Sequence, residues 1–358
     1  MKIVLLAAGK GTRMRPFTHE RPKCMAPLLD RPMIDHMILA AIGAGIDSVI
    51  MVIGHRRHVV REYLGDGEAL GVPIEYVIQE NPDGNGSATL LTEEAVGGEP
   101  FVCGYADIMT APHNYGRVVA DFERHQWDAV LTVNWVDDPH RGAAVYLEPV
   151  PGKGDRVADL IEKPPPGTSA SNWNNAGLYV FSPLIFDVLR TLPKSPRGEY
   201  ELSQAVGRMA ADTRNVGAVP IEGFWTDVAG LPELLRIQPD MIRASFGGEG
   251  IAVLPGAEVA DGATLVAPVM IAEGARVGRS VIGPNVCIGR GATVGPDCVL
   301  TDCILMEGAV VGDGCRLTRV FGETRAIIPP GTVLEAPENE CEFVPSATNG
   351  ELPSGSSP

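Results

Sequence analysis

The chain begins with a short apolar run that breaks into a glycine-bearing, basic loop, Met1-Lys2-Ile3-Val4-Leu5-Leu6-Ala7-Ala8-Gly9-Lys10-Gly11-Thr12-Arg13-Met14-Arg15-Pro16. A second basic stretch follows, Arg21-Pro22-Lys23-Cys24-Met25-Ala26-Pro27. A buried strand that ends in such a loop places backbone N–H groups at the carboxyl edge of a sheet, where anions bind. Because Arg13 and Lys23 add two fixed cations at the same place, the sequence predicts a triphosphate site.

Two commoner phosphate-binding motifs are excluded. A P-loop requires the order G-x-x-x-x-G-K-[ST], and Gly9-Lys10-Gly11-Thr12 has neither that length nor that order. A dinucleotide-binding fingerprint requires a third glycine where this chain has Met14. The remaining alternative is a plain turn between a strand and a helix, with solvated basic side chains.

The pattern resembles the sugar-1-phosphate nucleotidylyltransferases, whose signature is a strand followed by G-x-G-T-R and then P-K. The resemblance implies an enzyme that transfers a nucleotidyl group from a nucleoside triphosphate to a sugar 1-phosphate and releases pyrophosphate. It makes Arg13 and Lys23 catalytic groups that act on the phosphates. It assigns further nucleotide contacts to the strand end and the loop: Leu6, Ala8, Gly9, Gly11 and Thr12.

Segments rich in Val and Ile alternate with helix-like segments over the first two-thirds of the chain. Alternation of this kind implies an α/β fold with a mostly parallel sheet covered on both faces. Together with the resemblance it predicts a Rossmann-like, mixed, mostly parallel nucleotidyltransferase domain over residues 1–246. The predicted strands are 2–6, 48–53, 74–78, 101–103, 129–135, 143–148, 157–161 and 177–181, and the predicted helices are 33–44, 57–64, 87–95, 115–126, 183–192, 201–211 and 231–245.

The following segment has a different period. Aliphatic residues recur every six positions in three runs separated by five-residue steps: Val253, Val259, Leu265, Ile271 and Val277; Ile282, Ile288, Val294 and Leu300; Leu305, Val311 and Leu317. This is the hexapeptide signature of a parallel β-helix, in which each step forms one side of a coil and the aliphatic residue points inward. We expect about four coils over residues 250–335, with the left-handed winding that the resemblance implies. Residues 336–358, rich in Pro, Ser, Gly and Glu, are predicted to be a disordered tail.

Two aspartates are candidates for a metal site. Asp107 follows an apolar run, and Asp227 lies in Phe224-Trp225-Thr226-Asp227-Val228. Two carboxylates that converge on a phosphate loop suit Mg²⁺, which completes its shell with water and phosphate oxygens. The resemblance supports both, because the family has one metal-binding aspartate in a Gly-Asp motif and another in W-x-D. Ala106 departs from the family's glycine and adds a methyl group there.

Four further segments resemble the family's sugar-binding parts. Ile161-Glu162-Lys163-Pro164 matches E-K-P, so Lys163 is expected to bind the phosphate of the sugar as a catalytic cation, and Glu162 is expected to bind its hydroxyls. Asn174-Asn175-Ala176-Gly177 matches N-A-G, which makes Asn175 a sugar contact. Gly142 and Glu199 resemble further sugar contacts. The family has an aspartate where this chain has Gln204.

Base selection is predicted to rest on Gln79, with Gly84 close to the base. An amide both donates and accepts, so it can pair with N3–H and O4 of uracil or thymine. In the family, glutamine at this place accompanies pyrimidine enzymes, which favours UTP or dTTP. A guanine-selective enzyme of the mannose-1-phosphate guanylyltransferase type remains the alternative, and the other interpretation of Gln79 is a polar residue at a strand end.

Composition limits the partners and the location. The net charge is −16 and the sequence pI is about 4.9, so nucleic acid and anionic membranes are poor partners. Only six lysines are present, and two of them, Lys23 and Lys163, fall in the predicted phosphate motifs. The seven cysteines form no C-x-x-C pair, which favours a reducing compartment. With no signal peptide and no apolar stretch of roughly twenty residues, we expect a cytoplasmic protein.

Two other functions are weighed against the favoured one. All seven histidines precede the β-helix, the last being His140. An acyltransferase site in the β-helix would need a general base, so we expect a homo-oligomerisation or regulatory module there instead of a second active site. A non-catalytic nucleotide-sugar-binding regulatory subunit is the third possibility, against which the complete set of basic and acidic motif residues argues.

Overall fold

The structure is a computed structural model that describes residues 1–247 and 250–347. The chain divides into two compact units. The first comprises Met1–Ala26 and Met33–Asp227, and the second comprises Pro27–Pro32 and Val228–Pro358. The predicted boundary near residue 246 lies within the second unit.

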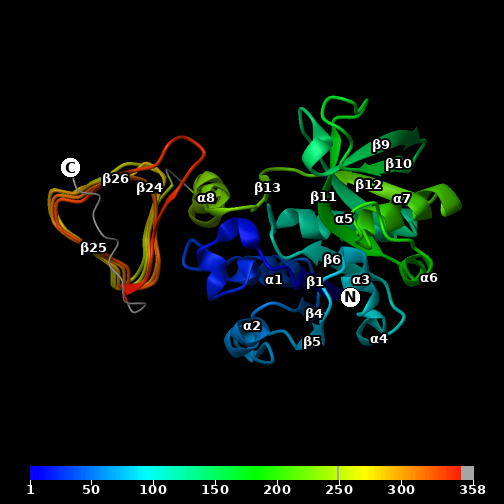
Figure 1. Ribbon diagram of the computed structural model, residues 1–358, viewed down its shortest axis with the longest axis horizontal. Coiled ribbons are helices and arrows are strands. Elements are labelled where there is room, and N and C mark those ends of the chain that lie inside the picture. Colours follow the sequence, from blue (N-terminus) through cyan, green and yellow to red (C-terminus); the bar gives the residue numbers. More distant parts are fainter. Residues whose placement is uncertain (248–249, 348–358) are drawn as a thin grey trace. The chain divides into compact units, whose positions relative to one another are not determined.

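A nine-stranded sheet forms the centre of the first unit, in the order β5-β4-β1-β6-β11-β8-β12-β10-β9 (Figure 1). β10 and β11 run opposite to the other seven strands, so the predicted mixed, mostly parallel sheet is confirmed. β7 and β13 pair in a separate antiparallel ribbon. The strands of this unit are β1 (Lys2–Ala7), β4 (Ser48–Ile53), β5 (Ile74–Ile78), β6 (Phe101–Tyr105), β7 (Ile108–Thr110), β8 (Ala129–Trp135), β9 (Ala143–Val150), β10 (Gly154–Glu162), β11 (Trp173–Phe181), β12 (Val216–Pro220) and β13 (Trp225–Asp227).

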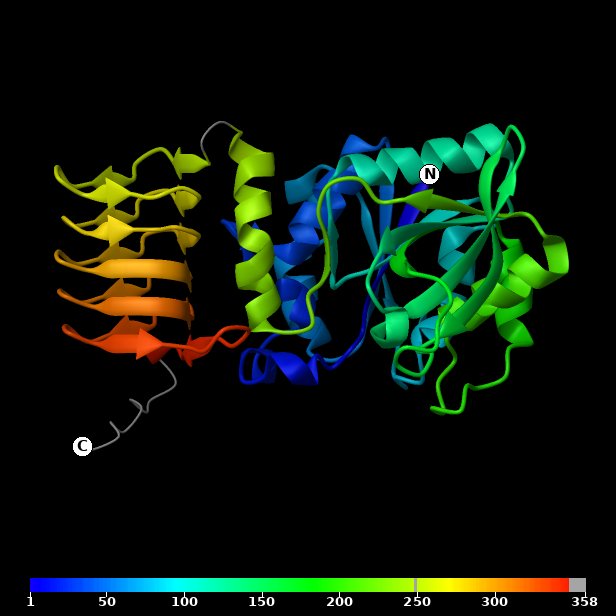
Figure 2. The ribbon, with the colours of Figure 1, turned by 90° about the horizontal axis from the view of Figure 1, so that it is seen from above.

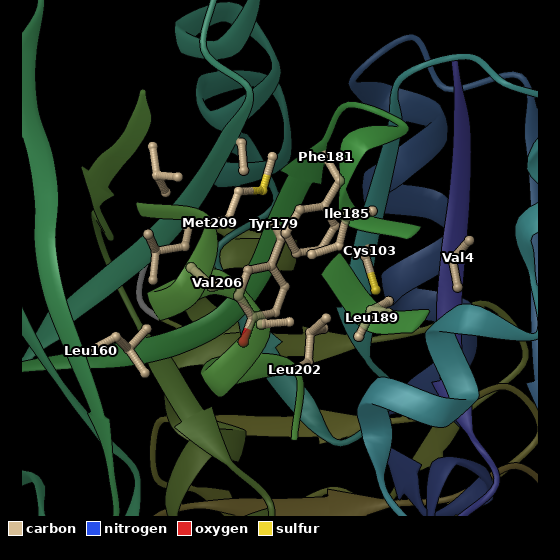
Figure 3. Close-up of a cluster of buried hydrophobic side chains, with 14 of the residues drawn as sticks. Val4, Cys103, Leu160, Tyr179, Phe181, Ile185, Leu189, Leu202, Val206 and Met209 are labelled. Atoms are coloured by element: carbon tan, nitrogen blue, oxygen red, sulfur yellow. The ribbon is translucent and has the colours of Figure 1, made fainter. Parts of the chain in front are cut away.

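Helices cover both faces of this sheet. α5 packs over β8, β11 and β12 and contacts α1. α3, α6 and α7 contribute the second layer, and their apolar side chains join those of the strands in one buried cluster that includes Tyr179, Phe181 and Leu202 (Figure 3). The helices are α1 (Met33–Gly43), α2 (Arg57–Leu64), α3 (Asn85–Leu90), α4 (Glu93–Val96), α5 (His113–His125), α6 (Leu184–Arg190) and α7 (Leu202–Thr213), with short 3₁₀ turns η1 (Thr12–Met14), η2 (Phe17–His19), η3 (Lys23–Met25), η4 (Glu68–Leu70) and η5 (Pro139–Arg141).

The predicted helix over residues 87–95 is wrong in one respect, because it is split into α3 and α4. Two threonines hydrogen-bond back into the helix at the break: Oγ1 of Thr89 donates to the carbonyl of Asn85, and Oγ1 of Thr92 donates to the carbonyl of Thr89. Side chains that bond the preceding turn compete with the helical backbone pattern and bend it. The α3 segment that results begins beside Gly84, one of the predicted nucleotide contacts.

The second unit is a stack of parallel coils, drawn in yellow to red in Figure 2. Ile251 pairs with Val269, and Val269 pairs with Val286, so one coil takes 17 or 18 residues. α8 continues through Pro239 and packs against β14, β17, β22 and β24. The elements are β2 (Pro27–Leu28), β3 (Arg31–Pro32), α8 (Leu231–Phe246), β14 (Ile251–Val253), β15 (Glu258–Val259), β16 (Thr264–Leu265), β17 (Val269–Ile271), β18 (Arg276–Val277), β19 (Val281–Ile282), β20 (Val286–Ile288), β21 (Thr293–Val294), β22 (Val299–Leu305), β23 (Val310–Val311), β24 (Arg316–Gly322), β25 (Ile327–Ile328), β26 (Val333–Glu335) and β27 (Glu342–Val344).

The six-residue period identifies the inward-facing side chains of these coils. The predicted aliphatic positions from Ile271 to Leu317 are buried. The three positions before them are more open: Val259 and Leu265 are half-buried, and Val253 is 46% exposed, because the first coil has a coil neighbour on one side only. Five strands stack in the sheet β15-β18-β21-β23-β25, so the stack is one coil longer than predicted. The additional coil escaped the pattern because Gly322 stands one coil after Leu305 and interrupts the aliphatic period.

Three remaining expectations concern the tail, the cysteines and the membrane. Residues 348–358 of the predicted disordered tail lie outside the described residues, whereas β27 lies within its first part. All seven cysteines are free thiols. Among the described helices, none is both long enough and apolar enough to cross a membrane.

Candidate active site

The loop after β1 offers backbone donors at the carboxyl edge of the sheet. Gly9 and Thr12 are exposed, and within residues 1–247 and 250–347 the backbone N–H groups of residues 9–11 have no hydrogen-bond acceptor. Gly11 adopts a φ of 59°, and a Cβ at this position would lie 3.1 Å from Cβ of Lys23. Glycine therefore lets the loop close against the lysine stem. Consecutive free N–H groups in such a loop form a concavity for an anion.

The strand end holds this loop in place. The carbonyl of Leu6 accepts a hydrogen bond from N–H of Ala106 at 3.1 Å, and the carbonyl of Ala8 accepts one from N–H of His55 at 3.4 Å. Arg13 follows in η1, is exposed, and has no ion-pair partner in the described part of the chain. Its guanidinium is therefore available to a phosphate.

Lys23 joins the two predicted metal-binding aspartates. Its Nζ donates to Oδ2 of Asp107 at 2.7 Å and lies 3.7 Å from Oδ1 of Asp227. The ribbon of β7 and β13 sets this geometry, because Asp227 is paired with Ile108, the neighbour of Asp107. The Lys23 side chain is only 11% exposed. The predicted convergence of these three side chains is thus a feature of the fold.

The same residues fit a divalent cation. The ammonium group of Lys23 already lies where a cation would sit between the two carboxylates. The side chains of Asp107 and Asp227 are 36% and 45% exposed. Within the described residues no cluster of three or more His, Cys, Asp or Glu side chains forms a metal site. Two carboxylates are a suitable set for Mg²⁺, which takes its other ligands from water and phosphate. Ala106, the departure from the family's glycine, is buried at 3% exposure.

Gln79 lies at the end of β5, where it is 7% exposed. Its Nε2 donates to the carbonyl of Gly84 and to Oγ of Ser87, each at 3.0 Å. The expectation that this amide both donates to and accepts from a base is therefore modified, since both N–H groups are used within the protein. Gly84 adopts a φ of 125°, and a Cβ here would lie 2.3 Å from the carbonyl oxygen of Tyr200, so only glycine fits.

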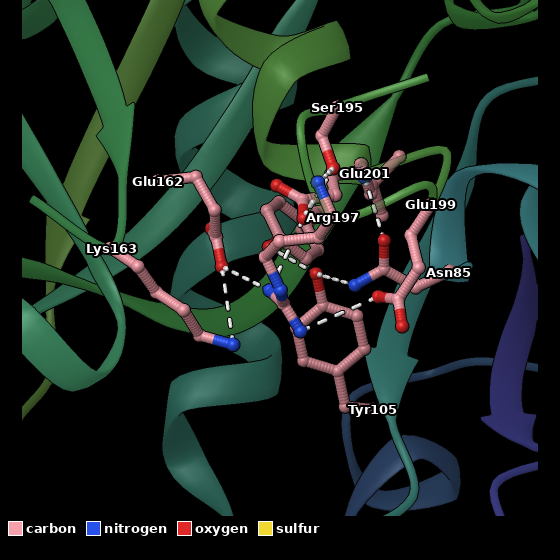
Figure 4. A network of polar contacts seen from close by, with 10 residues as sticks. Asn85, Tyr105, Glu162, Lys163, Ser195, Arg197, Glu199 and Glu201 are labelled. Carbon is pink, nitrogen blue, oxygen red and sulfur yellow. Dashed lines mark hydrogen bonds and ion pairs between the residues drawn. The ribbon is translucent and has the colours of Figure 1, made fainter.

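A charged cluster contains three of the predicted sugar-side residues (Figure 4). Nζ of Lys163 lies 3.9 Å from Oε1 of Glu162, and Nη1 of Arg197 lies 3.7 Å from the same oxygen. Arg197 also reaches Glu201 at 3.2 Å and Glu199 at 3.5 Å. Burial raises the pKa of Glu162 above its ordinary value, with Glu201 adding to the effect, while the hydrogen bond from Ser203 and the nearby cations lower it. The cluster thus presents cations and hydrogen-bond acceptors together.

Gly142 supports this cluster through the backbone. Its carbonyl accepts a hydrogen bond from N–H of Lys163 at 2.8 Å, which helps to hold Lys163 at its positive φ of 44°. A Cβ on Gly142 would lie 2.1 Å from Oδ1 of Asn174. The glycine is therefore required by the close approach of the Asn174 side chain.

A chain of hydrogen bonds connects the nucleotide-side loop to the sugar-side strand. Nδ2 of Asn85 donates to the hydroxyl of Tyr105 at 3.0 Å, and this hydroxyl lies 3.0 Å from that of Tyr179. Nδ2 of Asn175 donates to Tyr179 at 2.6 Å, and Oδ1 of Asn175 accepts from N–H of Gly177 at 3.1 Å. Asn175 is therefore fixed in orientation.

A family model described as nucleotidyl transferase matches residues 2–243. The chain belongs to the sugar-1-phosphate nucleotidylyltransferase family. A second model, described as the GMPPB C-terminal domain, matches residues 265–328.

Two of the similar proteins come from Haloferax volcanii. The low-salt glycan biosynthesis nucleotidyltransferase Agl11 is 34% identical over 236 residues, which are 65% of this chain and 63% of Agl11. The UTP–glucose-1-phosphate uridylyltransferase AglF is also 34% identical over 236 residues, 65% of this chain and 93% of AglF. A crystal structure of UDP-glucose pyrophosphorylase with UDP-glucose shares the fold, with a TM-score of 0.61 and 23% identity over 66% of this chain and 96% of that one.

The structure adds residues to this family site that motif reading did not find. Arg197 stands two residues before Glu199, but the sequence does not single it out, because an arginine among polar residues carries no signal of its own. Ser87 and Tyr105 were missed because their roles depend on side chains that are distant in sequence. Gln204, the other departure from the family pattern, is half-buried in the first turn of α7, where its N–H donates to the carbonyl of Glu201 at 3.1 Å.

Proposed function

We propose that this protein transfers a nucleotidyl group from UTP or dTTP to a sugar 1-phosphate, giving a nucleotide sugar and pyrophosphate. The observation that carries the proposal is the position of Lys23 between Asp107 and Asp227, beside the free N–H groups of the β1 loop. The similarity to a relative named as a uridylyltransferase supports the choice of UTP.

In the proposed reaction, an oxygen of the sugar 1-phosphate attacks the α-phosphorus, and pyrophosphate leaves. The attacking oxygen is already anionic at neutral pH, so the protein needs no nucleophile or general base. Alignment and charge neutralisation then supply the rate enhancement. Arg13 and Lys23 bind the triphosphate and stabilise charge on the leaving pyrophosphate, while Lys163 binds the incoming phosphate.

We propose Mg²⁺ as the cofactor, held by Asp107 and Asp227. A bound Mg²⁺ supplies Lewis-acid and template chemistry to the phosphate groups. On the sugar, Glu162 and Glu199 accept hydrogen bonds from hydroxyl groups, and Asn175 contributes its oriented amide. The left-handed winding of the β-helix, a homo-oligomer formed through it, and a cytoplasmic location are also part of this proposal.

GTP is the second candidate donor, and one observation favours it. Gln79 offers a base an acceptor, because both of its N–H groups are donated internally. The N1–H of guanine can donate to such an acceptor as well as N3–H of uracil can. An enzyme of the mannose-1-phosphate guanylyltransferase type is therefore compatible with the same side chain.

The test is pyrophosphate release with Mg²⁺ from five nucleoside triphosphates, each paired with the 1-phosphates of glucose, mannose, galactose and N-acetylglucosamine. We expect turnover with at least one pair. Arg13→Ala and Asp227→Ala are each expected to lower turnover at least about a hundredfold, as for the loss of one electrostatic stabiliser. A wild-type protein without turnover in any pair would support the non-catalytic regulatory subunit instead.

A further inference from the structure

The amide nitrogen of Gln79 is used in hydrogen bonds within the protein, whereas its oxygen is accessible to a ligand. Its nitrogen carries two hydrogens, and both are donated within the protein, to the carbonyl of Gly84 and to Oγ of Ser87. Over residues 1–247 and 250–347, Oε1 of Gln79 has no hydrogen-bond partner. Oε1 is not fully buried, so it keeps contact with solvent.

The number of protons available to the neighbouring groups also determines the orientation of the Gln79 amide. This argument does not depend on which end of the amide is taken as oxygen and which as nitrogen. The carbonyl oxygen of Gly84 is an acceptor only. The hydroxyl of Ser87 has a single proton, for which Oδ1 of Asp83 and the carbonyl of Gly84 compete. An ionised carboxylate is the stronger acceptor, so the proton goes to Asp83 and the hydroxyl turns lone pairs toward Gln79. A reversed amide would place Oε1 against two acceptors.

We propose that Ser87 and Asp83 are positioning residues that hold Gln79 as a pure acceptor, and thereby restrict the donor nucleotide to bases with a ring N–H at their pairing edge. Uracil, thymine and guanine have such a group. Cytosine and adenine present a ring nitrogen lone pair in its place, which repels Oε1 and leaves a buried acceptor unpaired. This inference rests on the proposed function, because it names the base class that the same site accepts.

UTP and CTP form a matched pair of probes, since they share the ribose and the triphosphate and differ at N3 and the 4-position of the base. Calorimetry with Mg²⁺ and the full-length protein gives the dissociation constant of each. We expect wild-type protein to bind UTP at least about tenfold more tightly than CTP, which is about 1.4 kcal/mol. GTP and ATP provide a second pair, because guanine has a hydrogen on N1 whereas adenine has a lone pair there.

Variants separate positioning from general support of the fold. Ser87→Ala frees one N–H of Gln79 and lets the amide reverse, so the UTP:CTP ratio is expected to fall about tenfold, toward one, with CTP affinity rising. Ser87→Thr keeps the hydroxyl and should keep the ratio, and Asp83→Asn should lower it. Ser280→Ala is the matched control: its hydroxyl also makes two hydrogen bonds, to Gly295 and from Cys298, but within the β-helix.

The outcomes distinguish this inference from the proposed function. If wild-type protein binds UTP and CTP equally, the acceptor role of Gln79 is overturned while nucleotide binding stands. If Ser87→Ala weakens both nucleotides by the same factor, Ser87 is structural and the positioning role is overturned. If wild-type protein binds none of the four nucleotides, the proposed function fails together with this inference.

Discussion

The pairing of Lys23 with two aspartates makes a prediction about divalent cations that does not depend on catalysis. At the proposed metal site, Mg²⁺ and the ammonium group would compete for the same oxygens, because Nζ lies 2.7 Å from Asp107 and 3.7 Å from Asp227. The carboxylates are partly exposed, so solvent screening limits each ion pair to about 1 kcal/mol. Lys23→Met keeps the apolar stem and removes both pairs. Without nucleotide, its affinity for Mg²⁺ should therefore rise by about 2 kcal/mol, or about thirtyfold.

The assay is calorimetric titration of the nucleotide-free protein with Mg²⁺, followed by pyrophosphate release. Turnover should move the other way, falling at least about a hundredfold, because Lys23 is also the residue proposed to bind the triphosphate. Lys153→Met is the matched control, since Lys153 donates to Asn215 and has no carboxylate partner among residues 1–247 and 250–347. Equal Mg²⁺ affinity in wild-type and Lys23→Met protein would refute the reasoning that the two cations share one position.

Three further predictions concern other parts of the site. Glu162→Gln should raise the melting temperature at neutral pH, because the raised pKa of Glu162 means that its ionised carboxylate destabilises the fold. This gain in melting temperature should vanish as the pH falls below the ordinary pKa of 4.5, where the carboxyl is protonated in both the folded and the unfolded chain. Gly84→Ala should destabilise the protein by roughly 2 kcal/mol in urea unfolding, because of strain at its φ and the contact with Tyr200. Tyr105→Phe should raise the KM for the sugar 1-phosphate more than the KM for the nucleotide and reduce stability by about 1 kcal/mol, since it breaks the link from Asn85 to the sugar side; an unchanged ratio of the two KM values would argue against that link.

The local parts of the fold could be predicted from the sequence because each has a short-range signal. The β1 loop is marked by its glycines and basic residues. The β-helix is marked by a six-residue period, because each side of a coil has six residues and one of them is an inward-facing aliphatic residue. The residues 48–53 and 129–135 were predicted as strands with the observed bounds because continuous apolar runs suit strands covered on both faces.

The long-range parts left no such signal. The insertion of β11 between β6 and β8, antiparallel to both, depends on which edges meet after folding. The contact of Arg197 with Glu162 likewise joins two segments that are far apart in the sequence. The orientation of the Gln79 amide required knowing that Ser87 and Gly84 lie against it, which only a folded α3 reveals.

The hairpin of β2 and β3 has a consequence for how the chain can be divided. Pro27–Pro32 belongs to the same unit as Val228–Pro358, and the thiol of Cys287 contacts the carbonyl of Leu29 there at 3.4 Å. No single cut yields both units whole, since a fragment starting at Val228 lacks this piece and a fragment ending at Asp227 carries it without its partner. These six residues are synthesised near the start of the chain. They can complete their packing only after the last third of the polypeptide has been synthesised.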